Sequence, residues 1–187
     1  MDFKPRLKLT ATLLATALFC SACQSLIPSA QGLVTPSWVA QSYQRQDQIE
    51  VEWKKHSFSF LLYQQQNGQN LEMVALSLTG QQLFKLSFDG KKVDVQQRIN
   101  QMKLLPFEYV VRDLLYATYP KFAQLQGSQI RVETSPSTQK IYIQQQAVLE
   151  IVHQSDSIEL NNVQVPYQMV ISSIDESLES DEASNAQ

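Results

Sequence analysis

The stretch from residue 104 to residue 120 constrains the fold most, because it carries the strongest helical pattern in the sequence. Its apolar side chains recur at three- and four-residue spacing, which places them along one broad side of a helix. These positions are Phe107, Val110, Val111, Leu114, Leu115 and Thr118. Pro106 suits the first turn of a helix and Pro120 cannot continue one, so the two prolines bound the segment. A lone helix with so wide an apolar side must cover a sheet.

Segments with alternating apolar residues lie on both sides of this helix. Five of them extend from residue 48 to residue 97, joined by hairpin sequences such as Asn67-Gly68, which predicts an antiparallel meander. About five more follow from residue 130 to residue 171. This order places strands from both halves of the chain around the central helix.

A short helix is also predicted before the first strand, over residues 37–46. Thr35-Pro36 ahead of it is a typical pair of N-cap and first-turn residues. The expected fold is therefore mainly β with α, a curved antiparallel sheet of about ten strands that forms an open half-barrel. The central helix and the short N-terminal helix would cover its concave face.

The alternation assigns one apolar face to each strand, and in the third segment this face carries Val74, Leu76 and Leu78. Ten strands would form a concave face wider than one helix can fill. That face is then either packed solid or left with an apolar cavity able to hold acyl chains. The sequence does not separate these two outcomes. The residues expected to line such a cavity are Val51, Trp53, Phe58, Phe60, Leu76, Phe84, Leu86, Phe88, Phe107, Val111, Leu114, Tyr167 and Met169.

The N-terminus is predicted to be a targeting segment, because basic residues precede an apolar run over residues 9–19 that is too short to span a bilayer. The run ends near Cys20 and Cys23. These cysteines would suit a disulfide or redox pair, a metal site, or a bacterial lipoprotein signal. The lipoprotein signal fits best at Cys23, because small Ala22 precedes it, whereas bulky Phe19 precedes Cys20. Cys23 is then the acylated N-terminal residue of the mature chain.

The domain organisation follows from this assignment. The residue after the acylated cysteine is Gln24. An aspartate at this position would resemble an inner-membrane retention signal. We therefore expect a lipid anchor in the outer membrane, with the domain facing the periplasm and outer-membrane lipid as its partner through Cys23. The expected parts are a signal peptide over 1–22, a lipidated N-terminus and tether over 23–35, a single β domain over 36–173 and a disordered acidic tail over 174–187.

Composition and motifs argue against several functions. The net charge is −3 and the sequence has no block of basic residues, so nucleic-acid binding is not expected. His56 and His153 lie far apart, and no nucleophile elbow or metal-spaced cluster is present. Arg112-Asp113 could form a site pair, but it is interpreted as a surface or cap interaction of the helix. Glu108 is expected to pair with Arg112. The sequence thus predicts neither an enzyme nor a cofactor.

Two blocks carry a resemblance to a known family. Residues 75–90 contain a Gly-x-x-Leu-Phe strand pair, and residues 105–120 contain a Leu-Pro…Arg-Asp-Leu helix that ends in Tyr119-Pro120. Both resemble blocks of an uncharacterised family of bacterial outer-membrane lipoproteins, a domain of unknown function whose members often lie beside genes for aryl polyene lipid synthesis. The wider architecture is similar to LolB and LolA, which accept and carry lipoproteins.

The resemblance implies a function in envelope lipid or lipoprotein handling. The protein would bind lipid or lipoprotein acyl chains, its possible cargo, in an apolar half-barrel. The alternative is a non-catalytic scaffold or partner subunit of an aryl polyene-type assembly system, with a filled core. A hydrolase that uses His56 or His153 is the third hypothesis.

Overall fold

The computed structural model describes residues 30–174, so the predicted signal peptide, Cys23 and the acidic tail from residue 175 lie outside the described residues. Ten strands form one sheet in the order β5-β4-β3-β2-β1-β10-β9-β8-β7-β6. The strands are β1 (Gln44–Trp53), β2 (His56–Asn67), β3 (Asn70–Leu76), β4 (Gln82–Phe88), β5 (Val93–Arg98), β6 (Ile130–Thr134), β7 (Thr138–Ile143), β8 (Gln146–His153), β9 (Ser157–Asn162) and β10 (Tyr167–Ser173).

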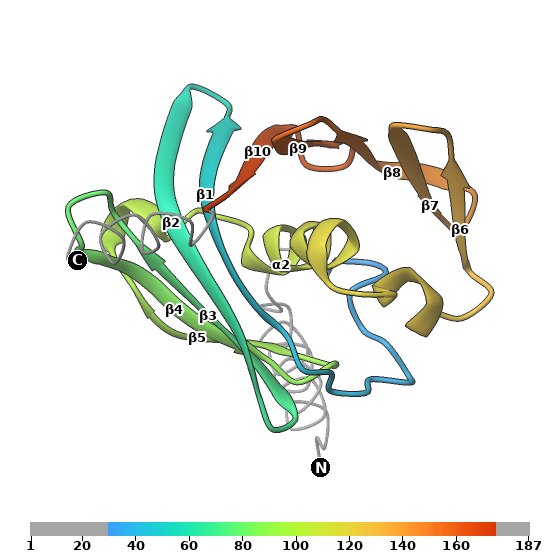
Figure 1. Ribbon diagram of the computed structural model, residues 1–187, viewed down its shortest axis with the longest axis horizontal. Coiled ribbons are helices and arrows are strands. Elements are labelled where there is room, and N and C mark those ends of the chain that lie inside the picture. Colours follow the sequence, from blue (N-terminus) through green and yellow to red (C-terminus); the bar gives the residue numbers. More distant parts are fainter. Residues whose placement is uncertain (1–29, 175–187) are drawn as a thin grey trace, which may run out of the picture.

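The first and last strands pair in the middle of the sheet. Ile49 of β1 lies opposite Ile171 of β10, and Val51 lies opposite Met169. Two antiparallel meanders, β1 to β5 and β6 to β10, are thereby joined into one curved sheet that wraps around α2 (Figure 1). The sheet does not close into a barrel, because β5 and β6 stand at opposite ends of the strand order. The predicted mainly β fold with an open, curved sheet is confirmed.

The central helix, α2, spans Phe107–Thr118 and is confirmed as the cover of the concave face. Pro106 stands at its N-cap position, one residue before the first helical turn where it was expected. The Phe107 ring packs edge-on against Phe84 of β4, with ring centroids 5.1 Å apart. Short 3₁₀ turns at Asn100–Met102 and Phe122–Leu125 connect the helix to the sheet on either side.

The predicted short helix over residues 37–46 is wrong, because no helix forms there and β1 already begins at Gln44. Contacts distant in sequence hold this segment extended instead. The Trp38 ring stacks on Tyr119 at 5.1 Å between centroids and meets Phe88 edge-on at 5.2 Å. An isolated helix this short is marginal in water, so these aromatic contacts outweigh its propensity.

The predicted apolar face of the third strand is also wrong. In β3 the buried side chains are Leu71, Met73 and Ala75, whereas Leu76 is only half-buried. Ala75 lies opposite Leu62, which fixes the register of β3 on β2. Because both faces of this segment are apolar, alternation alone did not identify the buried one.

Gly90 and Gly80 provide a matched test of how the Trp38 segment is held. Both have positive φ, +89° and +83°, so alanine at either position is strained by about 1–2 kcal/mol. A Cβ at Gly90 would lie 2.3 Å from Trp38 Cβ, whereas at Gly80 nothing lies within 4 Å. We expect Gly90→Ala to lower the free energy of unfolding by about 1–3 kcal/mol more than Gly80→Ala. Equal losses in urea unfolding would contradict this packing.

Candidate functional site

The concave face is filled by side chains in the described structure. Ten of the thirteen residues predicted to line a cavity are buried in one core cluster, and none of the ten is more than 6% exposed. A side chain that bordered a void wide enough for an acyl chain would keep accessible surface toward it, so these values indicate close packing. The ten are Val51, Phe60, Phe84, Leu86, Phe88, Phe107, Val111, Leu114, Tyr167 and Met169.

The other three predicted lining residues lie outside this cluster. Trp53 and Phe58 are half-buried and pack against the edge of the core. Leu76 is half-buried as well, on the face of β3 opposite the core. Of the two outcomes that the sequence left open, a solid core and an apolar cavity, the described residues form the solid core.

A buried ion pair lies beside this core on α2. The Arg112 and Asp113 side chains are both 0% exposed, and Arg112 Nε donates to Asp113 Oδ1 at 2.7 Å. Asp113 Oδ2 accepts hydrogen bonds from Asn162 Nδ2 at 2.6 Å and from the Tyr167 hydroxyl. Arg112 Nη1 donates to Gln164 Oε1 at 2.8 Å. The network therefore ties α2 to β9, β10 and the turn between them.

The interpretation of Arg112-Asp113 as a surface or cap interaction is therefore wrong. The expected pairing of Glu108 with Arg112 is wrong too, because the Arg112 guanidinium is used by Asp113. Burial raises the pKa of Asp113, and the charge of Arg112 opposes that rise. Arg112 Nη2 is buried and has no hydrogen-bond partner in the described residues. A charged pair this deep costs desolvation free energy, so its presence is not by itself a sign of added stability.

Arg112 is buried because a segment of the chain crosses the polar side of α2. We call residues 30–35 the strap. Three helix residues spaced four apart each bond the main chain of one successive strap residue. Glu108 Oε2 accepts from Ala30 N at 2.9 Å, Arg112 Nη1 donates to the Gln31 carbonyl at 3.1 Å, and the Tyr116 hydroxyl donates to the Gly32 carbonyl at 3.2 Å.

The far end of the strap is fixed to two other parts of the fold. Thr35 is buried, its N–H donates to the Gly90 carbonyl at 3.0 Å, and its hydroxyl donates to the Leu125 carbonyl at 2.7 Å. Leu33, which lies between Gly32 and Thr35 in the strap, belongs to the core. The predicted tether over residues 23–35 is therefore too long, because its last six residues pack on the domain.

Removing the Tyr116 hydroxyl tests how firmly the strap is held. Tyr116→Phe keeps the ring but deletes the hydrogen bond to Gly32, so we expect a loss of about 0.5–1.5 kcal/mol in unfolding free energy. The Leu33 amide donates within the strap to the Ala30 carbonyl at 3.2 Å. Its hydrogen exchange should accelerate while exchange in β1 stays unchanged. Unaltered protection at Leu33 would show that the bond does not hold the strap.

A second polar cluster lies on the concave side of β1 and β2. Arg45 Nε donates to Oδ1 and Oδ2 of buried Asp47, at 2.9 and 2.7 Å. Gln64 Nε2 donates to the same Oδ2 at 3.4 Å. Burial raises the pKa of Asp47, and Arg45 opposes the rise. Tyr43 donates to Thr118 Oγ1 at 2.9 Å, and burial raises the pKa of Tyr43 to about 12. This cluster joins the sheet to the C-terminal end of α2.

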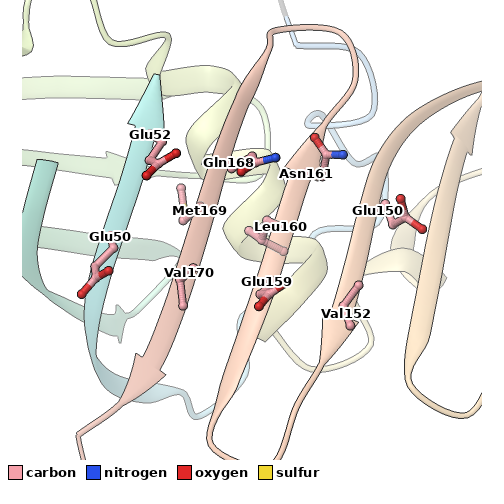
Figure 2. Close-up of a pocket in the computed structure, with 10 residues that line it drawn as sticks. All are labelled: Glu50, Glu52, Glu150, Val152, Glu159, Leu160, Asn161, Gln168, Met169 and Val170. Atoms are coloured by element: carbon pink, nitrogen blue, oxygen red, sulfur yellow. The ribbon is translucent and has the colours of Figure 1, made fainter. Parts of the chain in front are cut away.

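The face of the sheet opposite α2 carries a groove of about 480 Å³ (Figure 2). Carboxylates from β1, β8 and β9 border it, but Glu150 is paired with Lys140 at 3.2 Å. Among the described residues, no group of three or more histidine, cysteine or acidic side chains is arranged to hold a metal ion. Of the predicted lining residues only Met169 borders the groove, and its side chain is buried in the core. The groove is an open surface of mixed character, lined by six polar and four apolar residues.

The two histidines do not come together. His56 starts β2 and His153 ends β8, and both are exposed. Three strands separate β2 from β8, so at about 4.8 Å per strand the two lie on the order of 19 Å apart across the sheet. They form no shared site.

Sequence reasoning missed the buried polar network and the strap. One signal was present, because Arg112-Asp113 stands between two apolar pairs, which leaves only a narrow polar side on the helix. The partners Asn162 and Gln164 follow from the tertiary placement of the β9–β10 turn. No local pattern indicates them.

The fold and site define an open, single-sheet β protein whose concave face is sealed by α2. A family model described as "Protein of unknown function (DUF3261)" matches residues 44–175, so the chain belongs to this family. The match takes in the whole sheet, from the first residue of β1 to just beyond β10. No curated protein matches the chain. Within residues 30–174, no helix has the length and apolar character needed to cross a membrane.

Proposed function

We propose that this protein is a lipid-anchored, non-catalytic component of lipid or lipoprotein handling in the bacterial envelope, and that its domain acts by contacting a partner protein. The observation that carries the proposal is the filled concave face. With α2 in place, ten of the thirteen predicted lining residues are buried together in one core cluster, which supports a concave face without room for an acyl chain. Recognition is then left to the outer surface of the domain.

The ends of the sheet offer one such surface. β5 and β6 stand at the two ends of the strand order, so each has a side without a neighbouring strand in the described residues. An extended partner segment can add to an edge of this kind through main-chain hydrogen bonds. Both edges also carry exposed charges, such as Asp94 on β5 and Arg131 on β6, which discourage unspecific pairing.

The anchor is proposed at Cys23. Three acyl chains on this residue, each adding about 0.8 kcal/mol per buried CH₂, are enough for stable attachment. Gln24 supports placement in the outer membrane, facing the periplasm.

Cys23→Ala is expected to abolish metabolic labelling of the protein with fatty acids, because the acylated thiol is lost. Cys20→Ala is the matched control and should label as the wild type does. Labelling that persists in Cys23→Ala would refute the assignment.

Mild crosslinking in intact envelopes tests the partner function. We expect one envelope protein to be captured reproducibly with the wild type, and we expect Cys23→Ala to lose that capture because it is no longer held at the membrane. Finding no crosslinked protein with the anchored wild type would contradict a partner function.

Acyl binding is a second candidate, favoured by one specific observation. The helix α2, which covers the concave face, is joined to the sheet partly through the buried Arg112–Asp113 network. Buried ion pairs add little net stability compared with apolar packing, and some serve as switches. Displacement of α2 would expose the predicted apolar face to an acyl chain.

A further inference from the structure

Two exposed apolar side chains lie on segments that adjoin α2, Leu104 at its start and Val163 in a turn bonded to its middle. Leu104, in the turn just before the helix, is 77% exposed, and the preceding Lys103 is exposed beside it. Leu105 is buried, so the turn already has its apolar attachment to the core without Leu104. Val163, in the turn between β9 and β10, is 58% exposed. The next residue, Gln164, bonds Arg112 and so holds this turn against the same helix.

The chain from the anchor enters the domain at the start of α2. Ala30, the first strap residue, bonds Glu108 in the first turn of α2, and Leu104 lies four residues before Glu108. The strap is fixed by further bonds to Arg112 and Tyr116, so the entry point has a defined place on the domain. Seven residue steps separate Cys23 from Ala30, and at roughly 3.3–3.6 Å per step the acylated residue lies within about 25 Å of it.

We propose that the domain rests on the phospholipid surface with this end of α2, through an apolar contact made by Leu104 and supported by Val163. This inference rests on the anchoring at Cys23 proposed above. Lys103 places a cation where lipid phosphates would lie. The opposite sheet face carries Glu50, Glu52 and Glu159, so anionic lipid repels it and it faces away from the membrane.

The test uses the full acylated protein in vesicles of phosphatidylethanolamine and phosphatidylglycerol that contain nitroxide-labelled lipid. Acylation blocks Cys23, so a single added cysteine can carry a bimane fluorophore. Leu104→Cys and Val163→Cys probe the proposed contact, and Glu159→Cys on the opposite face is the control. We expect the nitroxide to quench the fluorophore at 104 at least twofold more strongly than at 159, with 163 between them. Quenching at 104 no stronger than at 159 would overturn the proposal.

Two further variants separate this inference from the anchor. If Leu104→Cys fails to fold, Lys103→Cys probes the same turn with the same expected result. Fatty-acid labelling of Cys23→Ala decides the anchor independently of the quenching pattern. Persistent labelling combined with strong quenching at 104 would refute Cys23 as the acylated residue but uphold the membrane-facing end. Loss of labelling combined with equal quenching at 104 and 159 would uphold the anchor but refute the contact.

Discussion

Arg112→Met is expected to lower the free energy of unfolding by about 3–5 kcal/mol at neutral pH. The Asp113 carboxylate would remain fully buried with no cation beside it, although Asn162 and Tyr167 still donate to it. Methionine fills much of the arginine volume, so the loss comes from the uncompensated charge. Urea unfolding measures it, and a loss below about 1 kcal/mol would contradict a buried, paired Arg112.

The pH dependence of this loss identifies its cause. Burial raises the pKa of Asp113, and Arg112 is the main group that opposes this rise. Without Arg112, the pKa of Asp113 in the folded variant is therefore higher still. A folded-state pKa above the unfolded value contributes stability at low pH that is lost as pH rises through it. The deficit of Arg112→Met should therefore shrink toward pH 4 and grow toward pH 7. The double variant Arg112→Met, Asp113→Asn should recover more than half of the loss at pH 7.

Phe84→Ala is expected to lower the free energy of unfolding by about 3–5 kcal/mol, because its ring is buried in the filled concave face. Phe84 is 1% exposed and meets Phe60 and Phe107 edge-on, at 5.7 and 5.1 Å between ring centroids. Its removal would leave a cavity that the facing rings cannot close. If the concave face instead held an open cavity, the ring would already border empty space and the loss would be smaller.

Leu78→Ala is the matched control for Phe84→Ala. Leu78 follows β3 and is 62% exposed, so its truncation should change the unfolding free energy by no more than about 0.5 kcal/mol. Similar losses for the two variants would contradict the observed burial. The sequence pattern alone placed Leu78 on the buried side of a longer strand, whereas β3 ends at Leu76.

Much of the fold could be predicted because its signals are local. The apolar spacing from Phe107 to Leu115 fixed the helix, and turn sequences such as Asn67-Gly68 fixed the hairpins. The pairing of β1 with β10 was not predicted, because it joins strands from the two ends of the domain and no local pattern indicates it. Where two faces were equally apolar, as in β3, only the register with β2 decided between them.

The site was harder to predict because its contacts join segments far apart in sequence. Arg112 is buried only because the strap and the β9–β10 turn cover it, and neither carries a helical or strand pattern. The choice between a cavity and a solid core depends on side-chain volumes summed over both meanders. Alternation identifies the residues that face inward, but it does not measure the space between them.

The lipid content of the purified, full-length protein tests the central claim most directly. Native mass spectrometry of the protein, extracted in mild detergent, counts non-covalently bound lipid separately from the covalent acyl chains. Because the concave face is filled by Phe84, Phe107 and their neighbours, we expect no non-covalent lipid on the wild type. One equivalent of bound lipid per protein would contradict the filled core and would favour acyl binding with α2 displaced.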